Sequence, residues 1–237
     1  MDKKIQDIRN KIEKPTTIFE IGGVIPKNDI YESWIGKVDI FNENEEIPLD
    51  KNGNQMLPLA QFHLSDLPYV PDKIKHIKFL TVFISMDFPE ILEEMGENWV
   101  IREYYDENEI TLKQLENENS YLKPFPLKSK FVENDCPIWD GGGLDDETEN
   151  EILELENNKI IDDYYEIVEH YYDTKFGGYP SFMQPGIGIG DGFGKGFEYI
   201  FQISSDEKVN LNVVDSGSLM FAKNIDSNKW SIYYDFC

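Results

Sequence analysis

Cysteine, histidine and basic residues are scarce in this 237-residue chain. The two cysteines, Cys136 and Cys237, are too few for the disulfide framework of a small secreted fold, so we expect free thiols and a cytoplasmic protein. The first residues lack the apolar core of a signal peptide, and no uncharged run is apolar enough to cross a membrane. The three histidines, His63, His76 and His170, stand in no known signature around Ser or Cys. The sequence therefore identifies no catalytic residue and no cofactor, and we favour a protein that is not an enzyme.

Acidic residues outnumber basic ones by 46 to 22, which gives a formal net charge of −24. Nucleic acids and anionic membranes bind clustered Lys and Arg, so neither is an expected partner. The charge is concentrated in two segments: residues 140–170 hold 12 acidic side chains and one lysine, and residues 87–118 hold 11 acidic side chains and two basic ones. These segments either keep the protein soluble or form the surface that a basic partner recognises.

Hydrophobic periodicity predicts an α+β fold. Ile5, Ile8 and Ile12 lie on one face of a short helix that Pro15 ends. Asp87 is expected to cap a second helix, and an apolar stripe over residues 160–172 indicates another. β-branched and aromatic runs elsewhere predict strands. We expect a single antiparallel-sheet-rich domain over 1–237, with acidic helices on the outside, divided into an N-terminal helix (1–15), a first half (16–135), an acidic helical segment (136–173) and a second half (174–237).

The two halves share an order of features. A glycine pair leads to a strand with a central glutamine: Gly22-Gly23 precedes Gln61 in the first half, and Gly177-Gly178 precedes Gln202 in the second. A strand containing Phe follows in each half. The spacing from the second glycine to the glutamine differs, at 38 residues against 24. This recurrence indicates an internal duplication, in which two similar halves pack around one core.

The same residues resemble the YwqG-like family over nearly the whole chain, from about Thr16 to the C-terminus. The resemblance rests on the order of several short motifs, which are Gly22-Gly23 with Pro26, Trp34, Ala60-Gln61-Phe62, Gly177-Gly178-Tyr179-Pro180 with Gln184, Phe201-Gln202-Ile203 with Asp206, Asp215-Ser216-Gly217 and the closing run from Trp230. It implies a compact bacterial α+β domain of largely unassigned function, with some members in toxin-immunity gene neighbourhoods. The family often has a His immediately ahead of the second glycine pair, where Thr174-Lys175-Phe176 stands here.

The second glycine pair and the two glutamines are the main candidate binding residues. Gly177 and Gly178 could form a rigid turn that presents Tyr179 and Gln184 to a ligand, or simply a tight turn between two elements. Gln61 and Gln202 are polar residues inside apolar strands. If buried, they either bond to each other or to backbone, or they form a paired amide site.

Three further motifs have an ordinary structural interpretation beside a functional one. The carboxylates of Asp140 to Glu147 suit Ca²⁺ or Mg²⁺ but equally suit a helix N-terminus, so metal binding stays open. The alternating glycines from Gly186 to Gly196 fit no phosphate-binding template and indicate a surface loop. Asp215, a candidate binding residue through the family resemblance, also fits a β-turn in which it bonds its own backbone.

Two functions from different classes remain. The first is a protein-binding module of immunity or antitoxin type that neutralises a basic, toxin-like partner, because charge complementarity speeds association. The second is a small-ligand binder or enzyme that uses a cleft between the two halves, with Gln61, His63, Gln202 and Asp206 as its polar lining. We favour the first. The oligomeric state cannot be inferred from these patterns.

Overall fold

The computed structural model describes residues 3–183 and 192–235. Ten strands form one sheet in which every neighbouring pair is antiparallel, and two short strands pair separately. From one edge to the other the ten strands are β12 (Lys229–Asp235), β11 (Ser218–Asn224), β10 (Glu198–Ser204), β9 (Lys175–Gly177), β1 (Lys14–Ile21), β8 (Phe125–Asp135), β2 (Trp34–Ile35), β4 (Leu57–His63), β5 (Phe79–Ile84) and β6 (Trp99–Tyr104). The separate pair is β3 (Ile40–Phe41) with β7 (Thr111–Leu112). The helices are α1 (Lys3–Ile12) and α2 (Asp146–Asn157), with 3-10 turns at Leu64–Asp66, Asp72–Ile74, Glu107–Glu109 and Tyr164–Glu166.

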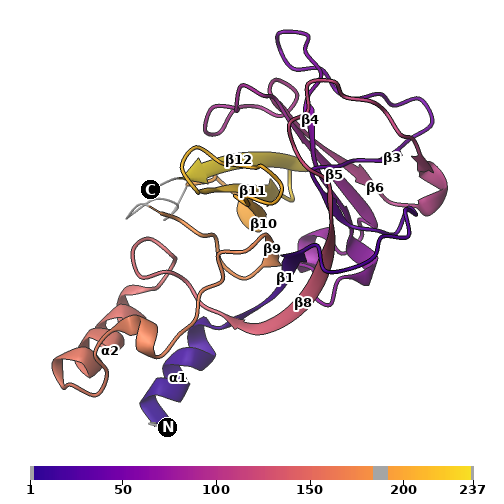
Figure 1. Ribbon diagram of the computed structural model, residues 1–237. Coiled ribbons are helices and arrows are strands. Elements are labelled where there is room, and N and C mark those ends of the chain that lie inside the picture. The colour runs from indigo at the N-terminus through magenta and orange to yellow at the C-terminus, as the bar shows by residue number, and fades with distance from the viewer. Residues whose placement is uncertain (1–2, 184–191, 236–237) are drawn as a thin grey trace.

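The large sheet curls into a nearly closed barrel, so that its two edge strands approach each other (Figure 1). Glu103 in β6 accepts hydrogen bonds from the Trp230 indole in β12 and from the Lys223 ammonium in β11. The Trp99 and Phe221 rings lie 6.0 Å apart across the same seam. Side chains rather than a backbone ladder therefore join the two edges of the barrel.

The core of the barrel is a stack of phenylalanine rings from adjacent strands. Phe176, Phe201 and Phe221 are register neighbours in β9, β10 and β11, and their rings stack at centroid distances of 4.8 and 4.5 Å. Phe62 from β4 meets Phe176 edge to face at 4.9 Å. All four side chains are fully buried, and full burial of one such ring stabilises the fold by roughly 1.5–3 kcal/mol.

The expected α+β fold with acidic helices around its outside is wrong, because the described chain is mostly antiparallel sheet with two short α-helices. The helix expected after Asp87 is absent: residues 87–96 form turns around Glu93, whose carboxylate accepts hydrogen bonds from the Glu90 and Asn98 amides. Such side-chain bonds to backbone compete with helix formation. The stripe over 160–172 yields one 3-10 turn, because its aromatic and β-branched residues have low helix propensity.

Helix α2 is acidic and packs against α1 at one end of the barrel (Figure 1). Ile8 and Ile12 of α1 and Ile152 and Leu155 of α2 share a small core with Cys136. Lysines of α1 pair with glutamates of α2, in the ion pairs Lys4–Glu154 and Lys11–Glu151. Part of the acidic charge of residues 140–170 is thus balanced by the N-terminal helix that was expected over 1–15.

Two sets of strands repeat one pattern of hydrogen bonds. Gln61 in β4 lies opposite Trp34 in β2, and Gln202 in β10 lies opposite Lys175 in β9. The next register pair is Ile35 with Ala60 in the first set and Phe176 with Phe201 in the second. The strands β2, β4, β5 and β6 therefore correspond to β9, β10, β11 and β12.

This register assigns Gly36, and not the pair Gly22-Gly23, to the position of Gly177. Gly36 directly follows β2 and has a φ of +73°, and Gly177 ends β9 with a φ of +79°. Each lies 25 residues before its glutamine. The alignment of Gly22-Gly23 with Gly177-Gly178 was therefore wrong, since it depended on the conspicuous glycine pairs and not on strand pairing.

The correspondence extends to irregularities and to the centre of the sheet. A β-bulge interrupts β4 between Pro58 and Ala60, and another interrupts β10 between Tyr199 and Phe201, at the same distance from each glutamine. At the centre, β1 pairs with β9 while β8 pairs with β2. The strand that precedes the first set, β1, thus pairs with the second set, and the strand that precedes the second set, β8, pairs with the first. This exchange ties the two sets into one barrel.

Candidate functional site

Two cavities share Phe19 of β1 in their lining and lie at corresponding positions of the two strand sets. The first, the His63 pocket, has a volume of about 430 Å³ and is lined by residues from the loop before β2, from the end of β4 and from β8. The second, the Asp206 pocket, has a volume of about 660 Å³ and is lined by β1, the segment before β9 and the end of β10. His63 and Asp206, expected in one cleft, therefore lie in two separate cavities.

His63 is the last residue of β4, and its ring packs against two aromatic rings. It stacks on Phe79 with centroids 4.7 Å apart, and the tilted Tyr31 ring lies 5.3 Å from it and 6.3 Å from Phe79, so the two rings pack against different sides of His63 at about a right angle and not on opposite faces. Its backbone amide donates to the Ser33 hydroxyl at 3.0 Å. Its Nδ1 lies 3.2 Å from Asp66 Oδ2, but this contact lacks hydrogen-bond geometry and the buried Nδ1 has no hydrogen-bond partner.

The Asp206 pocket has the same construction with different side chains. Ser204 takes the position of His63, and its amide donates to the Thr174 hydroxyl at 3.1 Å, as His63 does to Ser33. The Ser204 hydroxyl donates to the Tyr172 carbonyl at 2.6 Å. Asp206 Oδ1 accepts from the Lys208 amide at 2.7 Å. Ser204 and Asp206 are therefore both hydrogen-bonded within the chain.

Gln61 and Gln202 line neither cavity, because both are fully buried and bonded to backbone. The Gln61 side chain accepts from the Asp39 amide at 2.7 Å and donates to the Glu32 carbonyl at 2.9 Å. Gln202 accepts from the Ser181 amide at 3.0 Å and donates to the Asp173 carbonyl at 3.0 Å. Each glutamine thus fixes the chain on both sides of a short strand.

The turn at Gly177-Gly178-Tyr179 encloses the buried carboxylate of Asp135 at the end of β8. Asp135 Oδ2 accepts from the Tyr179 amide and from the Lys175 ammonium, both at 2.8 Å. At Gly178 the φ is +64°, and a Cβ would lie 2.0 Å from that carboxylate oxygen. Glycine is therefore required at 178 both by backbone conformation and by close approach. The Tyr179 side chain is itself buried.

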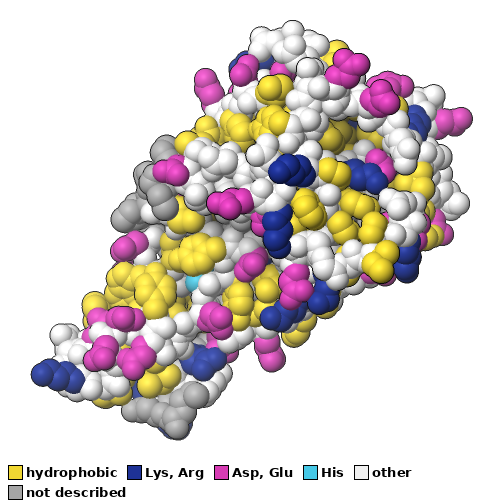
Figure 2. Space-filling view, viewed as in Figure 1, with side chains coloured by type: hydrophobic (Ala, Val, Ile, Leu, Met, Phe, Trp, Pro, Cys, Tyr) yellow, Lys and Arg dark blue, Asp and Glu magenta, His cyan; other side chains and the backbone are white. Residues whose placement is uncertain are grey.

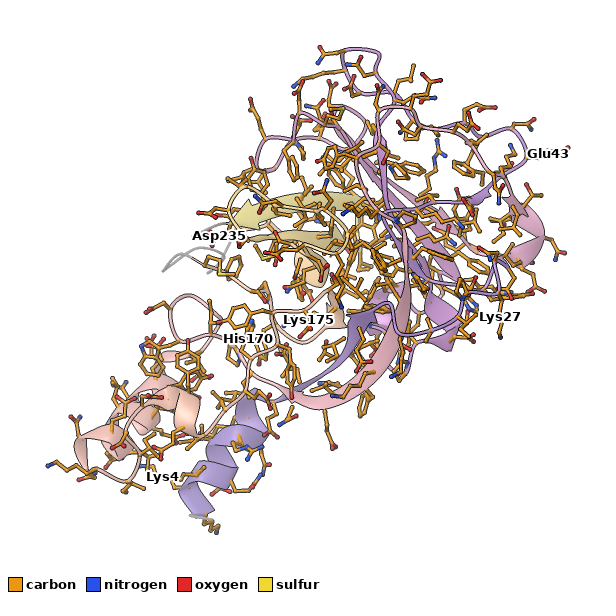
Figure 3. The ribbon with its side chains drawn as sticks, viewed as in Figure 1. Lys4, Lys27, Glu43, His170, Lys175 and Asp235 are labelled. Carbon is orange, nitrogen blue, oxygen red and sulfur yellow. The ribbon has the colours of Figure 1, made fainter. Side chains whose placement is uncertain are left out.

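His170, which Figure 3 shows near Lys175, extends this cluster together with its partner Ser181. The His170 ring contacts the Cys136 carbonyl through Nδ1 at 2.6 Å and the Ser181 hydroxyl through Nε2 at 2.8 Å. Burial lowers the pKa of His170 to about 4, helped by the positive charge of Lys175. Burial also lowers the pKa of Lys175, against the opposing effect of Asp135.

These shifts favour a structural role for the cluster. The serine and histidine side chains are almost completely buried, and the neutral imidazole is satisfied at both nitrogens. Cys136, next to Asp135, has a pKa raised to about 12 by burial, so it is a thiol at neutral pH and not a nucleophile. The cluster lacks the access that a catalytic nucleophile needs.

The remaining candidates have ordinary roles or lie outside the described residues. Asp145 Oδ1 accepts from the Thr148 amide at 2.7 Å and caps α2, and these bonds lower its pKa. No three His, Cys, Asp or Glu side chains of residues 3–183 and 192–235 are arranged to hold a metal ion. The turn around Asp215 is closed by Asn212, which accepts from the Ser216 amide. Gln184 lies outside the described residues, as does the first part of the glycine run, 186–191.

A family model described as "Domain of unknown function (DUF1963)" matches residues 33–227. The chain belongs to this family. The matched range contains Gln61, Gln202 and both glycine turns of the repeated pattern, while β1 at the centre of the barrel precedes it. No curated protein matches the chain. In the part of this DUF1963 protein that the structure describes, no helix has the length and apolar character needed to span a bilayer.

Sequence reasoning missed Asp135, Lys175 and Asp66. A lysine between Thr174 and Phe176, in a strand that is otherwise buried, is the one local signal of a buried ion pair. Asp66 follows His63 by three residues, which is the spacing of neighbours on a helical turn. Neither signal identifies a site unless the long-range pairing of the strands is known.

Proposed function

We propose that the protein is a binding module for a basic protein partner, of immunity or antitoxin type, and that within its family it is a YwqG-like member. The observation that carries the proposal is the composition of the exposed acidic loop, residues 86–97. Four hydrophobic side chains in this loop are 42–51% exposed, namely Met86, Ile91, Leu92 and Met95. Five carboxylates accompany them, at Asp87, Glu90, Glu93, Glu94 and Glu97.

The carboxylates of the loop are mostly unneutralised. Among the described residues, Lys51 is the one cation that pairs with them, and it contacts Glu93 at 3.7 Å. Glu93 is also held by the Asn98 amide, whereas Glu90 and Glu94 are exposed. The lysines of α1, by contrast, offset two glutamates of α2. The exposed acidic loop therefore retains a negative field that attracts a basic surface.

A cavity of about 460 Å³ adjoins this loop and supplies an apolar surface. It is lined by Leu92 and Met95 from the loop, by Phe193 and Phe197, and by Trp230 of β12. The loop is attached to that strand, because the Leu92 amide donates to the Ile232 carbonyl at 3.0 Å. Apolar side chains surrounded by carboxylates suit a partner with a basic rim around an apolar centre. On the face seen in Figure 2, acidic and hydrophobic side chains are intermixed.

The test is association with the product of the neighbouring gene, measured by stopped flow and calorimetry at several salt concentrations. The double variant Glu90→Gln/Glu94→Gln is expected to slow association several-fold and to flatten its salt dependence, since rim charges act mainly on the on-rate. The matched control, Asp162→Asn/Asp163→Asn, removes two exposed carboxylates near α2 and should leave both quantities unchanged. Equal effects of the two variants would mean that association depends on the total net charge and not on the exposed acidic loop.

The apolar part of the surface has its own test. Leu92→Ala and Met95→Ala are expected to raise the dissociation rate and leave the on-rate unchanged, because buried contacts act on complex lifetime. A control substitution of the equally exposed Leu112, at the separate β3–β7 pair, should have no effect. Absence of binding to a basic neighbouring gene product by the wild-type protein would contradict the proposed function.

A further inference from the structure

The two pockets differ at one corresponding position, and the difference points to a ligand. Ser204 and His63 occupy the same place in the repeated strands, as their matching amide bonds to Thr174 and Ser33 show. The Ser204 hydroxyl is satisfied by the Tyr172 carbonyl. The His63 side chain is 91% buried and its Nδ1 has no hydrogen-bond partner. A buried polar atom left in this state costs roughly 1–3 kcal/mol, so its retention requires an explanation.

The carboxylates around His63 are not equivalent. Glu32 accepts hydrogen bonds from the Lys27 and Asn28 amides, and Asp29 accepts from the Tyr31 amide at 2.9 Å. These two carboxylates therefore shape the loop that forms one wall of the pocket. Asp66 has no such role: its side chain is 75% exposed and its one close polar contact among the described residues is the His63 ring.

The charge of the lining selects the sign of the ligand. Asp29, Glu32 and Asp66 face a single lysine, Lys27, among the residues around the cavity. A cation is therefore favoured over an anion of the same size. Most of the rest of the wall is apolar or aromatic and includes Phe19, Tyr31, Leu67 and Leu127, while Ser33 and Ser129 add two hydroxyl groups.

The two acceptors that lack a donor lie next to each other. In the tautomer that carries its proton on Nε2, His63 Nδ1 is an acceptor, and it lies 3.2 Å from Asp66 Oδ2 with no hydrogen bond between them. Rotation of the Asp66 side chain, which is 75% exposed, away from the His63 ring would admit a single N–H-bearing cationic group that donates to both. We propose that the His63 pocket binds a small organic cation, whose ammonium, amidinium or guanidinium group lies between His63 Nδ1 and Asp66 and whose apolar body packs against Tyr31 and Leu127.

The size and mouth of the pocket fit this class of ligand. A volume of about 430 Å³ is within the usual range for small-molecule sites, roughly 300–1,000 Å³. Tyr31 is 47% exposed and its hydroxyl is held by Glu107 at 3.1 Å. Its ring is thereby fixed beside His63, where it can contact a planar cation. The Asp206 pocket has carboxylates in its lining, but Ser204, which takes the place of His63, is already hydrogen-bonded, so this pocket lacks the unpaired buried acceptor.

The experiment uses benzamidine and benzylamine as cationic probes and benzamide and benzoate as neutral and anionic controls of similar shape. Binding is measured by calorimetry and by amide chemical shifts on the full chain. The cations are expected to bind at least tenfold more tightly than benzamide, with the largest shifts at Ser33, His63 and Asp66. Asp66→Asn should raise the dissociation constants of the two cations about tenfold or more, because it removes a charged acceptor.

His63→Ser places in the first pocket the residue that the second pocket already has, so the backbone geometry is known to accept it. This variant should raise the dissociation constants of the cations by a similar factor. Asp206→Asn, the matched change in the other pocket, should leave their binding unchanged. If the substitution at position 63 prevents folding, Asp66→Asn at an exposed side chain still provides the test. Equal affinity for benzamidine and benzamide, or unchanged affinity in Asp66→Asn, would overturn the proposal.

The cation could come from a free metabolite or from an arginine side chain of another chain. Agmatine and N-acetylarginine amide distinguish these sources: a free ligand favours agmatine, whereas an arginine side chain makes the blocked amino acid at least as good. The inference is independent of the exposed acidic loop, because Glu90→Gln/Glu94→Gln should leave benzamidine binding unchanged. Failure of partner binding alone would therefore not contradict cation binding by the His63 pocket, and failure of cation binding alone would not contradict the proposed function.

Discussion

Gln61 and Gln202 make the same two backbone hydrogen bonds, each bridging the residues before and after a short strand. Because both side chains are fully buried, nothing replaces these bonds when the amide is removed. We expect Gln202→Ala to lower the free energy of unfolding by roughly 2–4 kcal/mol, since it leaves buried backbone groups unpaired. Urea unfolding measures this. Gln114→Ala, at an exposed glutamine, is the control and should be nearly neutral; comparable losses would contradict the assigned role.

Alanine substitutions at Gly178 and Gly23 distinguish the cost of backbone strain from the cost of steric conflict. Both have positive φ, at +64° and +78°, but a Cβ at 178 would strike Asp135 while a Cβ at 23 meets nothing within 4 Å. Gly23→Ala should cost about 1 kcal/mol from backbone strain alone. Gly178→Ala should cost at least about 3 kcal/mol, because Asp135 is held by Lys175 and cannot withdraw. Equal losses in thermal or urea unfolding would show that the carboxylate moves freely.

Local patterns predicted some elements of this fold and missed the connections among them. The N-terminal helix follows from the spacing of its isoleucines, and the two glutamine strands follow from apolar runs rich in β-branched and aromatic residues. The corresponding glycine, Gly36, was missed because a single glycine in a loop-rich stretch gives no local signal. Its role is visible once β2 is seen to pair with β4.

The candidate site shows the same limit. Asp135 and Lys175 are 40 positions apart, and each would be expected on the surface from its type. Their burial follows from the pairing of β1 with both β8 and β9, which is a long-range property of the sheet. His63 was identified from sequence as part of the polar lining of a cleft, but its unpaired Nδ1 depends on its position beside Asp66 and the loop before β2.

His170 makes stability depend on pH below neutrality. Its pKa is lowered to about 4 in the folded protein by burial and by Lys175, whereas an unfolded histidine titrates near 6.5. The unfolded chain therefore binds the proton first, so this contribution, roughly 3 kcal/mol, is present above pH 6.5 and is lost as the pH falls toward 4. His170→Gln should flatten the unfolding free energy between pH 6.5 and 4.5. The exposed His76→Gln should keep the wild-type profile, and parallel curves for all three proteins would disprove the effect.

Glu103 joins the open edges of the barrel. Burial acts to raise its pKa, but hydrogen bonds from Lys223, Tyr105 and Trp230 outweigh burial and lower it. The Lys223 side chain is 1% exposed, so Glu103→Gln leaves a buried ammonium without its counter-charge and should cost about 3 kcal/mol. Glu103→Gln/Lys223→Met should recover much of this loss, because it removes both charges together.

The strands in which hydrogen exchange accelerates distinguish an ion pair that holds the barrel edges together from an ordinary ion pair. If Glu103 holds the barrel closed, hydrogen exchange in Glu103→Gln should accelerate first at β6 and β12 and leave β1 and β8 protected, since edge strands open before central ones. Glu20→Gln, at the exposed pair with Lys128, should leave all four strands unchanged because exposed pairs contribute little. Uniform acceleration across the sheet would mean that the barrel unfolds as one unit and that its edges are not a separate point of opening.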